Sequence, residues 1–339
     1  MGLEVFDYEV EGQMSIFDLT QKEFKITKPI RLIELFAGVG SQAMALRDLG
    51  ADFEHYRVVE FDKYAIASYN AIHGTDFPTM DITKVSGEDL GIVDTINYCY
   101  IMTYSFPCQD LSVAGLGKGM SKGSGTRSGL LWEVERLLNE VDNLPQVLLM
   151  ENVPQVHGKK NMDDFQRWID FLESKGYSNF WEDLNAKNYG VAQNRNRTFM
   201  ISILGQHQYK FPKPIPLTKI MKDYLEDEVD EKYYLNNERA KKLIETLIEN
   251  RTINDNSEQI CVDLTINEPG EINVSNCIKA RYDAGIGNFK QDGSGVVECC
   301  HMNYKRIDKT TDLAKTLCAR DYKGFGTGFD TMNGVIECK

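Results

Sequence analysis

The chain has 339 residues, of which 42% are hydrophobic and 26% are charged, a composition typical of a soluble protein with one large and one smaller domain. It has no run of 18 apolar residues and no secretion signal, and its eight cysteines include no CxxC pair, which argues against a disulfide framework or a zinc ribbon. We therefore expect a cytoplasmic protein with no membrane anchor and no metal, whereas the net charge of −13 leaves the kind of partner open.

Short apolar runs alternate with helical patterns from residue 31 to residue 205. The runs that we expect to form buried strands are 31–36, 56–61, 98–103, 147–150 and 198–204. Helical spacing marks residues 41–49, with Gly50 as the stop, and residues 130–141. This alternation predicts a doubly wound, Rossmann-like α/β domain over 30–205, preceded by an N-terminal arm over 1–29.

The sequence changes character after Gly205. Residues 206–220 hold three of the nine prolines, which indicates a hinge, and an amphipathic helical pattern covers 238–250. Beyond residue 272 an internal repeat appears with an offset of 39 residues, so that Ala280-Arg281 recurs as Ala319-Arg320 and the segment 296–299 recurs as 335–338. Two copies favour a pair of similar β-hairpins within a small β-rich domain over 206–339.

A glycine-containing turn, Phe36-Ala37-Gly38-Val39-Gly40-Ser41, follows the first strand and opens a helix. Its glycines allow a ligand to approach the backbone, and Glu60, at the end of the next strand, is placed to bind ribose hydroxyls. Ala43 stands where a dinucleotide fingerprint has its third glycine, which disfavours NAD. A merely structural tight turn is the alternative for this motif.

Two further strands also end in reactive side chains. Cys108, in Ser105-Phe106-Pro107-Cys108-Gln109, follows the run 98–103 and precedes a loop with six glycines between residues 115 and 129, a composition that suits a closing lid. This position favours a nucleophile over a small buried hydrophobe. Glu151 follows the run 147–150 and suits a general acid, the alternative being an ordinary acidic residue at a strand end.

Two arginines, Arg195 and Arg197, precede the last strand of the large domain. Their spacing of two residues at the start of a strand directs both side chains to one face, where they could hold a phosphate or a base carbonyl. By themselves they could equally be surface ion pairs.

In this order and spacing, the motifs resemble the cytosine-C5 DNA methyltransferase family. Its blocks appear as FAGVGS, VVEFD, the MDI containing Asp81, SFPCQ, RSGLLWE, MENV and QNRNR. The resemblance is dense from residue 31 to about 205 and continues loosely through 229–235 into a region that matches the family's target-recognition domain. Ser105 and Ser41 depart from the family pattern, which commonly has glycine before the Phe-Pro-Cys, without removing a needed functional group.

The resemblance implies a DNA (cytosine-5-)-methyltransferase that uses S-adenosylmethionine and flips its target cytosine out of double-stranded DNA. The implied catalytic residues are Cys108, Glu151, Arg195 and Arg197. The implied cofactor-binding residues are Phe36, Ala37, Gly38, Gly40, Ser41, Glu60, Phe61, Asp81, Ile82, Pro107 and Leu130. The DNA-binding candidates are Gln109, Ser112, Gln193, Arg281, Arg320 and Lys323.

The family's last two blocks, a helix with an Arg-Leu core and a Gly-Asn-Ser/Ala segment, have no match before Lys339. A missing C-terminus, a second polypeptide that supplies these blocks, and a form without activity would each explain this. The alternative functions are a tRNA cytosine-C5 methyltransferase, which shares the catalytic blocks, and a catalytically incomplete subunit that needs a partner chain. The length of the region 206–339 argues against the tRNA enzyme.

Overall fold

The computed structural model describes residues 22–111, 119–226, 238–253, 259–265, 269–277, 293–299, 314–315 and 335–338. The chain divides into two compact units. The first contains Met1–Asp183 and Thr198–Pro212, and the second contains Leu184–Arg197 and Lys213–Lys339. Division at Pro212 falls within the expected proline-rich hinge, but the ribbon Leu184–Arg197, which we expected in the large domain, groups with the second unit.

The first unit alternates strands and helices, as the sequence predicts. Its strands are β1 (Lys22–Glu23), β2 (Ile30–Leu35), β3 (Phe53–Val59), β4 (Cys99–Tyr104), β5 (Val147–Asn152), β6 (Tyr177–Asn185), β8 (Asn196–Leu204) and β9 (His207–Gln208). Its helices are α1 (Ser41–Asp48), α2 (Lys63–His73), α3 (Leu131–Glu140) and α4 (Met162–Ser174), with short 3₁₀ turns η1 (Ile82–Lys84), η2 (Glu88–Leu90), η3 (Ser128–Leu130) and η4 (Pro154–His157).

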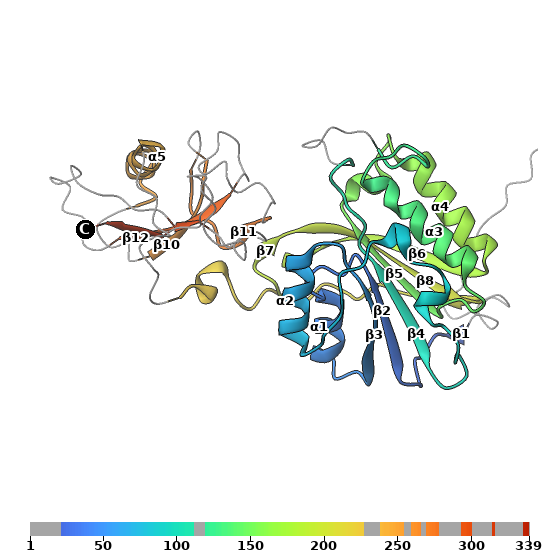
Figure 1. Ribbon diagram of the computed structural model, residues 1–339. Helices are drawn as coiled ribbons and strands as arrows, with labels where there is room; N and C mark the ends of the chain where they lie inside the picture. Colours follow the sequence, from blue (N-terminus) through green and yellow to red (C-terminus); the bar gives the residue numbers. More distant parts are fainter. Residues whose placement is uncertain are drawn as a thin grey trace, which may run out of the picture. The chain divides into compact units, whose positions relative to one another are not determined.

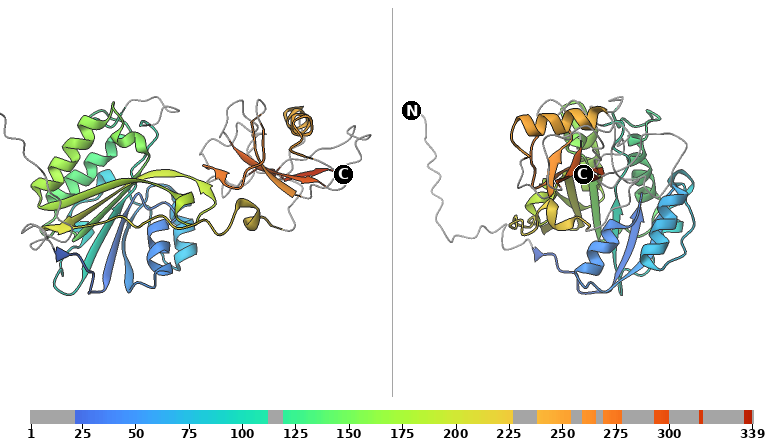
Figure 2. Two further views of the ribbon diagram at one scale, coloured as in Figure 1. Left: turned by 180° about the vertical axis from the view of Figure 1, so that it is seen from behind. Right: turned by 90° about the vertical axis from the view of Figure 1, so that its left-hand side faces the viewer.

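Six strands form the central sheet in the order β3-β2-β4-β5-β8-β6. The strands β3, β2, β4 and β5 pair in parallel, and β8 runs antiparallel to β5. Figure 1 shows α1 and α2 on one face of the sheet and α3 and α4 on the other, and the view from behind in Figure 2 shows the same layers. This arrangement confirms the predicted doubly wound, Rossmann-like α/β fold.

Burial explains why these segments form the centre of the unit. All six residues of β4 are buried, as expected for a strand covered by helices on both faces. The larger apolar cluster joins the sheet to α3 and α4 through side chains such as Leu131, Leu137, Phe165 and Trp168. Smaller clusters pack α1 and α2 against the opposite face.

In its described residues, the second unit combines short strands with one amphipathic helix. Its elements are η5 (Ala186–Asn188), β7 (Gln193–Asn194), η6 (Met221–Tyr224), α5 (Glu238–Glu249), β10 (Gln259–Asp263), β11 (Ser275–Asn276), β12 (Ser294–Cys299), β13 (Ala314–Lys315) and β14 (Val335–Cys338). The apolar face of α5 packs Leu243 and Leu247 against Val262 and Val297 of β10 and β12.

The repeated segments 296–299 and 335–338 are neighbouring strands of one sheet. β12 pairs with β14 in parallel, with Val296 opposite Val335 and Cys299 opposite Cys338, so equivalent repeat positions lie side by side. β12 also pairs antiparallel with β10 and β13. The repeat therefore supplies adjacent strands to a shared sheet.

Some expected boundaries shift. The strand predicted over 56–61 is β3, which begins earlier, at Phe53, and ends earlier, at Val59. Phe61 lies beyond the strand, with 77% of its surface exposed. The expected N-terminal arm contains β1, which pairs with β9, while residues 1–21 lie outside the described part. In the ranges that the structure describes, no helix has both the length and the apolar character to cross a bilayer.

Candidate active site at the carboxyl edge of the sheet

The strand register brings four sequence motifs to one edge of the sheet. Leu35 pairs with Val59 on one side and with Tyr104 on the other, and Tyr104 pairs with Met150. The last residues of β3, β2 and β4 are thus level with Met150 of β5. The residues that follow this row, Glu60, Phe36, Ser105 and Glu151, belong to the four motifs. Ligand sites of open α/β sheets form at this carboxyl edge.

The turn between β2 and α1 is held in an uncommon backbone conformation. Phe36, Gly38 and Gly40 have φ angles of 56°, 58° and 78°, in the left-handed region that glycine adopts readily and phenylalanine rarely does. A Cβ on Gly40 would lie 2.4 Å from His73 Nε2, whereas one on Gly38 would have no atom within 4 Å. Gly40 therefore packs against α2, and Gly38 has open space beside its backbone.

Glu60 connects this turn to the following segments. Its Oε2 accepts a hydrogen bond from Gly38 N at 2.9 Å and its Oε1 accepts one from Asp62 N at 2.7 Å, while its carbonyl accepts one from Met80 N at 2.8 Å. A carboxylate has about four acceptor positions, so two remain for ligand hydroxyls. Of the other predicted cofactor residues here, Ala37 is buried against α2 and Ser41 begins α1.

The loop that carries Cys108 is held by side chains from three other segments. Gln42 Nε2 donates to Ser105 Oγ at 3.2 Å, Asn152 Nδ2 donates to Phe106 O at 3.0 Å, and Ser128 Oγ donates to Pro107 O at 2.7 Å. Asn152 and Ser128 are almost fully buried. These three bonds fix consecutive residues immediately before the half-buried Cys108, as a preorganised nucleophile requires.

The next residues anchor the start of the glycine-rich loop. Asp110 Oδ2 accepts from Arg127 N at 2.8 Å, its carbonyl accepts from Gly119 N at 3.0 Å, and Gln109 Oε1 accepts from Arg127 Nη1. Residues 112–118, including the predicted DNA contact Ser112, lie outside the described part. The two ends of this loop are therefore joined beside Cys108.

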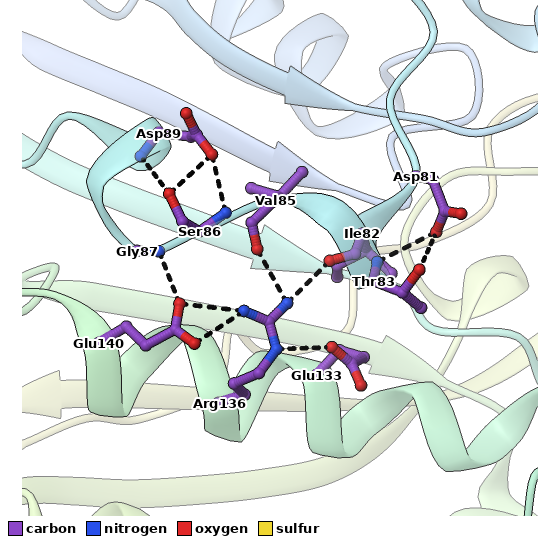
Figure 3. A network of polar contacts seen from close by, with 10 residues as sticks. All are labelled: Asp81, Ile82, Thr83, Val85, Ser86, Gly87, Asp89, Glu133, Arg136 and Glu140. Atoms are coloured by element: carbon purple, nitrogen blue, oxygen red, sulfur yellow. Dashed lines mark hydrogen bonds and ion pairs between the residues drawn. The ribbon is translucent and has the colours of Figure 1, made fainter.

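Asp81 is held in a capped turn. Its Oδ1 accepts from Thr83 N at 3.0 Å and from Thr83 Oγ1 at 2.8 Å, and these hydrogen bonds lower the pKa of Asp81. Ile82 is buried in the main core, where Leu130, at the end of η3, packs as a partly buried residue. Figure 3 shows the Asp81 turn facing α3, which follows Leu130 directly.

The predicted residues in the ribbon 184–197 have partners within the second unit. Gln193 belongs to β7, which pairs in parallel with β11. Arg195 Nη1 lies 3.9 Å from Cys277 Sγ, and Arg197 Nη1 donates to the carbonyl of Asn196 at 2.7 Å. Arg281, Arg320 and Lys323 lie outside the described residues.

Sequence reasoning assigned no role to Gln42, Ser128 or Asn152. Asn152 was detectable as a polar residue at the end of an apolar strand, next to Glu151, because a buried amide needs a hydrogen-bond partner. Gln42 and Ser128 carry no such signal, since their partners are 63 and 21 residues away in the chain.

Comparison with known proteins agrees with this geometry. Residues 30–323 match the family described as C-5 cytosine-specific DNA methylase. The type II methyltransferase M2.ScrFI of Lactococcus lactis subsp. cremoris is 34% identical over 259 residues, which cover 62% of this chain and 71% of that protein. The orphan methyltransferase M.SssI of Spiroplasma monobiae is 37% identical over 265 residues, which cover 62% of this chain and 68% of that protein.

A solved structure shares the fold. The methyltransferase EhMeth of Entamoeba histolytica superposes with a TM-score of 0.58 at 14% identity, covering 89% of this chain and 88% of its own. The family match extends over most of the sequence and includes every motif at the carboxyl edge of the sheet. The chain belongs to the C-5 cytosine-specific DNA methylase family.

Proposed function

We propose that this chain is a DNA (cytosine-5-)-methyltransferase that methylates C5 of a cytosine within a specific duplex sequence. The observation that carries the proposal is the register of β2, β4 and β5, in which Leu35, Tyr104 and Met150 pair in one row. The glycine turn, the Cys108 loop and Glu151 follow this row and therefore begin beside one another at a single edge of the sheet. Family membership supplies the reaction class, and the residues at this edge are the chemical groups that the reaction needs.

The residues at the edge fit S-adenosylmethionine. Open space beside Gly38 admits a ligand against the backbone, and the Glu60 carboxylate keeps acceptor positions for two ribose hydroxyls. Phe61 presents an exposed ring that suits stacking on the adenine, and Asp81 presents a carboxylate that suits a hydrogen-bond donor at the edge of the adenine. When bound, S-adenosylmethionine supplies an electrophilic methyl group.

Cys108 and Glu151 make the cytosine ring able to accept that methyl group. The Cys108 thiolate forms a bond to C6 while Glu151 delivers a proton to N3, so that electron density rises at C5. After C5 gains the methyl group, loss of the C5 proton to a base, cleavage of the C6–sulfur bond and return of the N3 proton to Glu151 restore the ring and release the Cys108 thiolate. Arg195 and Arg197 hold the base carbonyl or the adjacent phosphate.

This chemistry requires a base that has left the DNA stack, because C6 must be reached from the face of the ring. Gln109, Ser112 and Gln193 are the proposed contacts that receive the flipped nucleotide, and Arg281, Arg320 and Lys323 are those that read or hold the duplex. Six glycines between residues 115 and 129 suit a loop that changes conformation over the bound base.

The test compares methyl transfer in variants of two cysteines, Cys99 at the start of β4 and Cys108 in the loop that follows β4. Cys108→Ala should abolish transfer of labelled methyl groups to DNA, whereas Cys99→Ala should retain it, because Cys99 begins β4 as a buried residue whose pKa burial raises to about 11. Both variants should keep their DNA and cofactor affinity. Methyl transfer by Cys108→Ala at a near-normal rate would contradict the assignment.

The substrate class is tested with the same preparation. Duplex DNA and transfer RNA are offered in parallel, and bisulfite sequencing of DNA from expressing cells locates the product. Labelled RNA without labelled DNA would favour the tRNA enzyme. Activity that appears only on addition of a co-purified polypeptide would identify the chain as a subunit of a two-chain enzyme.

A further inference from the structure

Arg136 on α3 bonds to two glutamates of its own helix and to the turn after Asp81. Its Nε donates to Glu133 Oε2 at 2.8 Å, and its Nη1 donates to Glu140 Oε1 at 2.9 Å and Oε2 at 3.0 Å. Its Nη2 donates to the carbonyls of Ile82 and Val85, both at 2.9 Å (Figure 3). Because a guanidinium has five N–H groups, each of them has an acceptor here.

The two carbonyls enclose the short turn η1 that begins directly after Asp81. Within this segment, Val85 N reaches Ile82 O at 3.3 Å, and Asp81 itself caps the turn through Thr83. A 3₁₀ turn of three residues has few internal bonds with which to keep its shape. Lys84 N also donates to Asp81 O at 2.9 Å. The bonds from Arg136 to Ile82 O and Val85 O therefore add two attachments to α3 for the backbone that follows Asp81.

Glu140 extends the same network to the following turn. Its Oε2 accepts from Gly87 N at 2.8 Å, and a Cβ on Gly87 would lie 2.6 Å from Glu140 Cβ, so the loop backbone is in close contact with the end of α3. The hydrogen bonds from Arg136 and Gly87 lower the pKa of Glu140, which keeps this acceptor charged. The segment 82–87 is thus attached to α3 at two places.

The other end of α3 lies at the proposed site as well. Leu130 immediately precedes α3, and Ser128, two residues earlier, holds the carbonyl of Pro107. One rigid helix therefore connects the Asp81 turn with Leu130 and the loop of Cys108. Displacement of Asp81 relative to these residues is opposed by the bonds of Arg136, together with the burial of Ile82 and Val85 in the main core.

We propose that Arg136 is a positioning residue for S-adenosylmethionine. Its hydrogen bonds raise cofactor affinity by holding the backbone of Asp81 and Ile82 at a fixed position relative to α3. This inference rests on the cofactor site of the proposed function and adds a residue that touches no ligand. Lysine cannot replace the arginine, because a single ammonium cannot span two carboxylates and two carbonyls at once.

The experiment measures the dissociation constant for S-adenosylmethionine, KM, kcat and the melting temperature for Arg136→Lys. A small displacement of a binding group is expected to raise the dissociation constant and KM by roughly tenfold or more, with kcat at saturating cofactor nearly unchanged. Glu140→Gln weakens the hydrogen bonds from Arg136 and Gly87 and should therefore give a smaller change in the same direction. It replaces Arg136→Lys in the experiment if that variant does not fold.

Arg31→Lys is the matched control. Arg31 also makes several side-chain bonds, to Glu54 and to the Tyr100 hydroxyl, but it lies near the beginning of β2, at the opposite end of the strand from the glycine turn. It should lower the melting temperature and leave cofactor affinity unchanged. If Arg136→Lys behaves in the same way, Arg136 is only structural and the inference is overturned.

A double-mutant cycle with Asp81→Ala separates the inference from the assignment on which it rests. If Arg136 acts through Asp81, Arg136→Lys has a much smaller effect on cofactor affinity in the Asp81→Ala background than in the native protein. Additive effects would overturn the inference while leaving Asp81 as a cofactor residue. An unchanged affinity in Asp81→Ala alone would overturn the Asp81 assignment, and with it the inference.

Discussion

Glu151 is the second-last residue of β5, where its backbone pairs with Phe199 of the antiparallel strand β8. This pairing fixes the backbone of Glu151, so the carboxyl group is presented by a strand rather than by a loop. Its neighbour Asn152 points to the Cys108 loop instead. Adjacent residues of one strand thus have different tasks, one in the proposed chemistry and the other in holding the nucleophile loop.

We expect Glu151→Gln to lower the rate of methyl transfer by roughly two orders of magnitude or more, as for the loss of a general acid. The amide keeps the size of the side chain but cannot deliver the proton to N3. Cofactor affinity should change little, since the proposed role of the carboxyl group is toward the base. Single-turnover kinetics and a cofactor titration check this, and a large loss of cofactor binding with normal chemistry in the bound complex would contradict it.

Glu34 is a fully buried carboxyl group behind the glycine turn. The Tyr69 hydroxyl donates to its Oε2 at 2.6 Å, and His55 Nδ1 lies 2.6 Å from the same hydroxyl. Burial raises the pKa of Glu34 to about 7, an effect that the hydrogen bond from Tyr69 only partly offsets. Burial and the neighbouring His73 also lower the pKa of His55.

The raised pKa makes a prediction about stability. Since the folded protein holds the Glu34 proton more tightly than the unfolded chain, this contribution is present below the unfolded pKa of 4.5 and is lost as the pH rises through about 7. Relative to the wild type, Glu34→Gln should therefore gain about 3 kcal/mol in free energy of unfolding between pH 4.5 and pH 8. His55 titrates with the opposite sign in both proteins, so their difference isolates Glu34. Denaturant curves at the two pH values with a constant difference would refute this.

At the scale of elements, the connection between β2 and α1 combines two glycines with different surroundings. Gly40 contacts Tyr69 and His73 of α2, and His73 Nε2 lies 3.0 Å from the carbonyl of Val39. Gly38 has open space beside it and donates its N–H to Glu60. Gly40 serves the packing of the turn against α2, and Gly38 leaves its backbone accessible to a ligand.

This difference predicts separate effects for two similar substitutions. Gly40→Ala places a methyl group into α2 and should lower the free energy of unfolding by roughly 3 kcal/mol or more, since the steric conflict adds to the left-handed strain. Gly38→Ala should cost about 1–2 kcal/mol from strain alone and should weaken S-adenosylmethionine binding more than its loss of stability explains. Equal cofactor affinities in the two variants, after correction for the folded fraction, would argue against ligand contact at Gly38.

At the scale of the whole molecule, a chain with a net charge of −13 must bind a polyanion through local groups. Residues 273–339 are slightly basic, with ten Lys and Arg against eight Asp and Glu, so the excess of acid lies in the preceding part. The repeat in this segment places Arg281 and Arg320 at equivalent positions, one residue after an alanine in each copy. We propose that these two arginines share one role, either in reading the target sequence or in bracing the repeat.

We expect alanine at Arg281 or Arg320 to relax the choice of target sequence by about 1–3 kcal/mol at one base position. Lys323→Ala should instead weaken binding to all sequences alike and reduce the dependence of affinity on salt. Genome-wide maps of methylated sites for the three variants distinguish these effects. An unchanged target motif for both arginine variants, together with lower melting temperatures, would assign the arginines to the scaffold.

The sequence alone determined the fold class and the family, because both depend on local signals. Apolar runs placed β2, β4, β5 and β8 within one or two residues of their observed bounds. The predicted reactive groups lie directly after the runs of β2, β4 and β5 and directly before the run of β8. Sequence reasoning began β3 three residues late and missed β1, since a short strand at an edge of the fold has little apolar patterning.

Only the tertiary structure decided which groups support the reactive ones. The strand register that places Glu60, Phe36, Ser105 and Glu151 along one edge of the sheet arises from pairing between strands that are distant in the sequence. The bonds from Asn152 to Phe106 and from Arg136 to Ile82 join residues 46 and 54 positions apart. Likewise, the ribbon 184–197 belongs to the second unit because β7 pairs with β11, about 80 residues later in the chain. Local periodicity records which face of an element is buried, but not the partner against which it is buried, and that choice is made by the long-range packing of the folded chain.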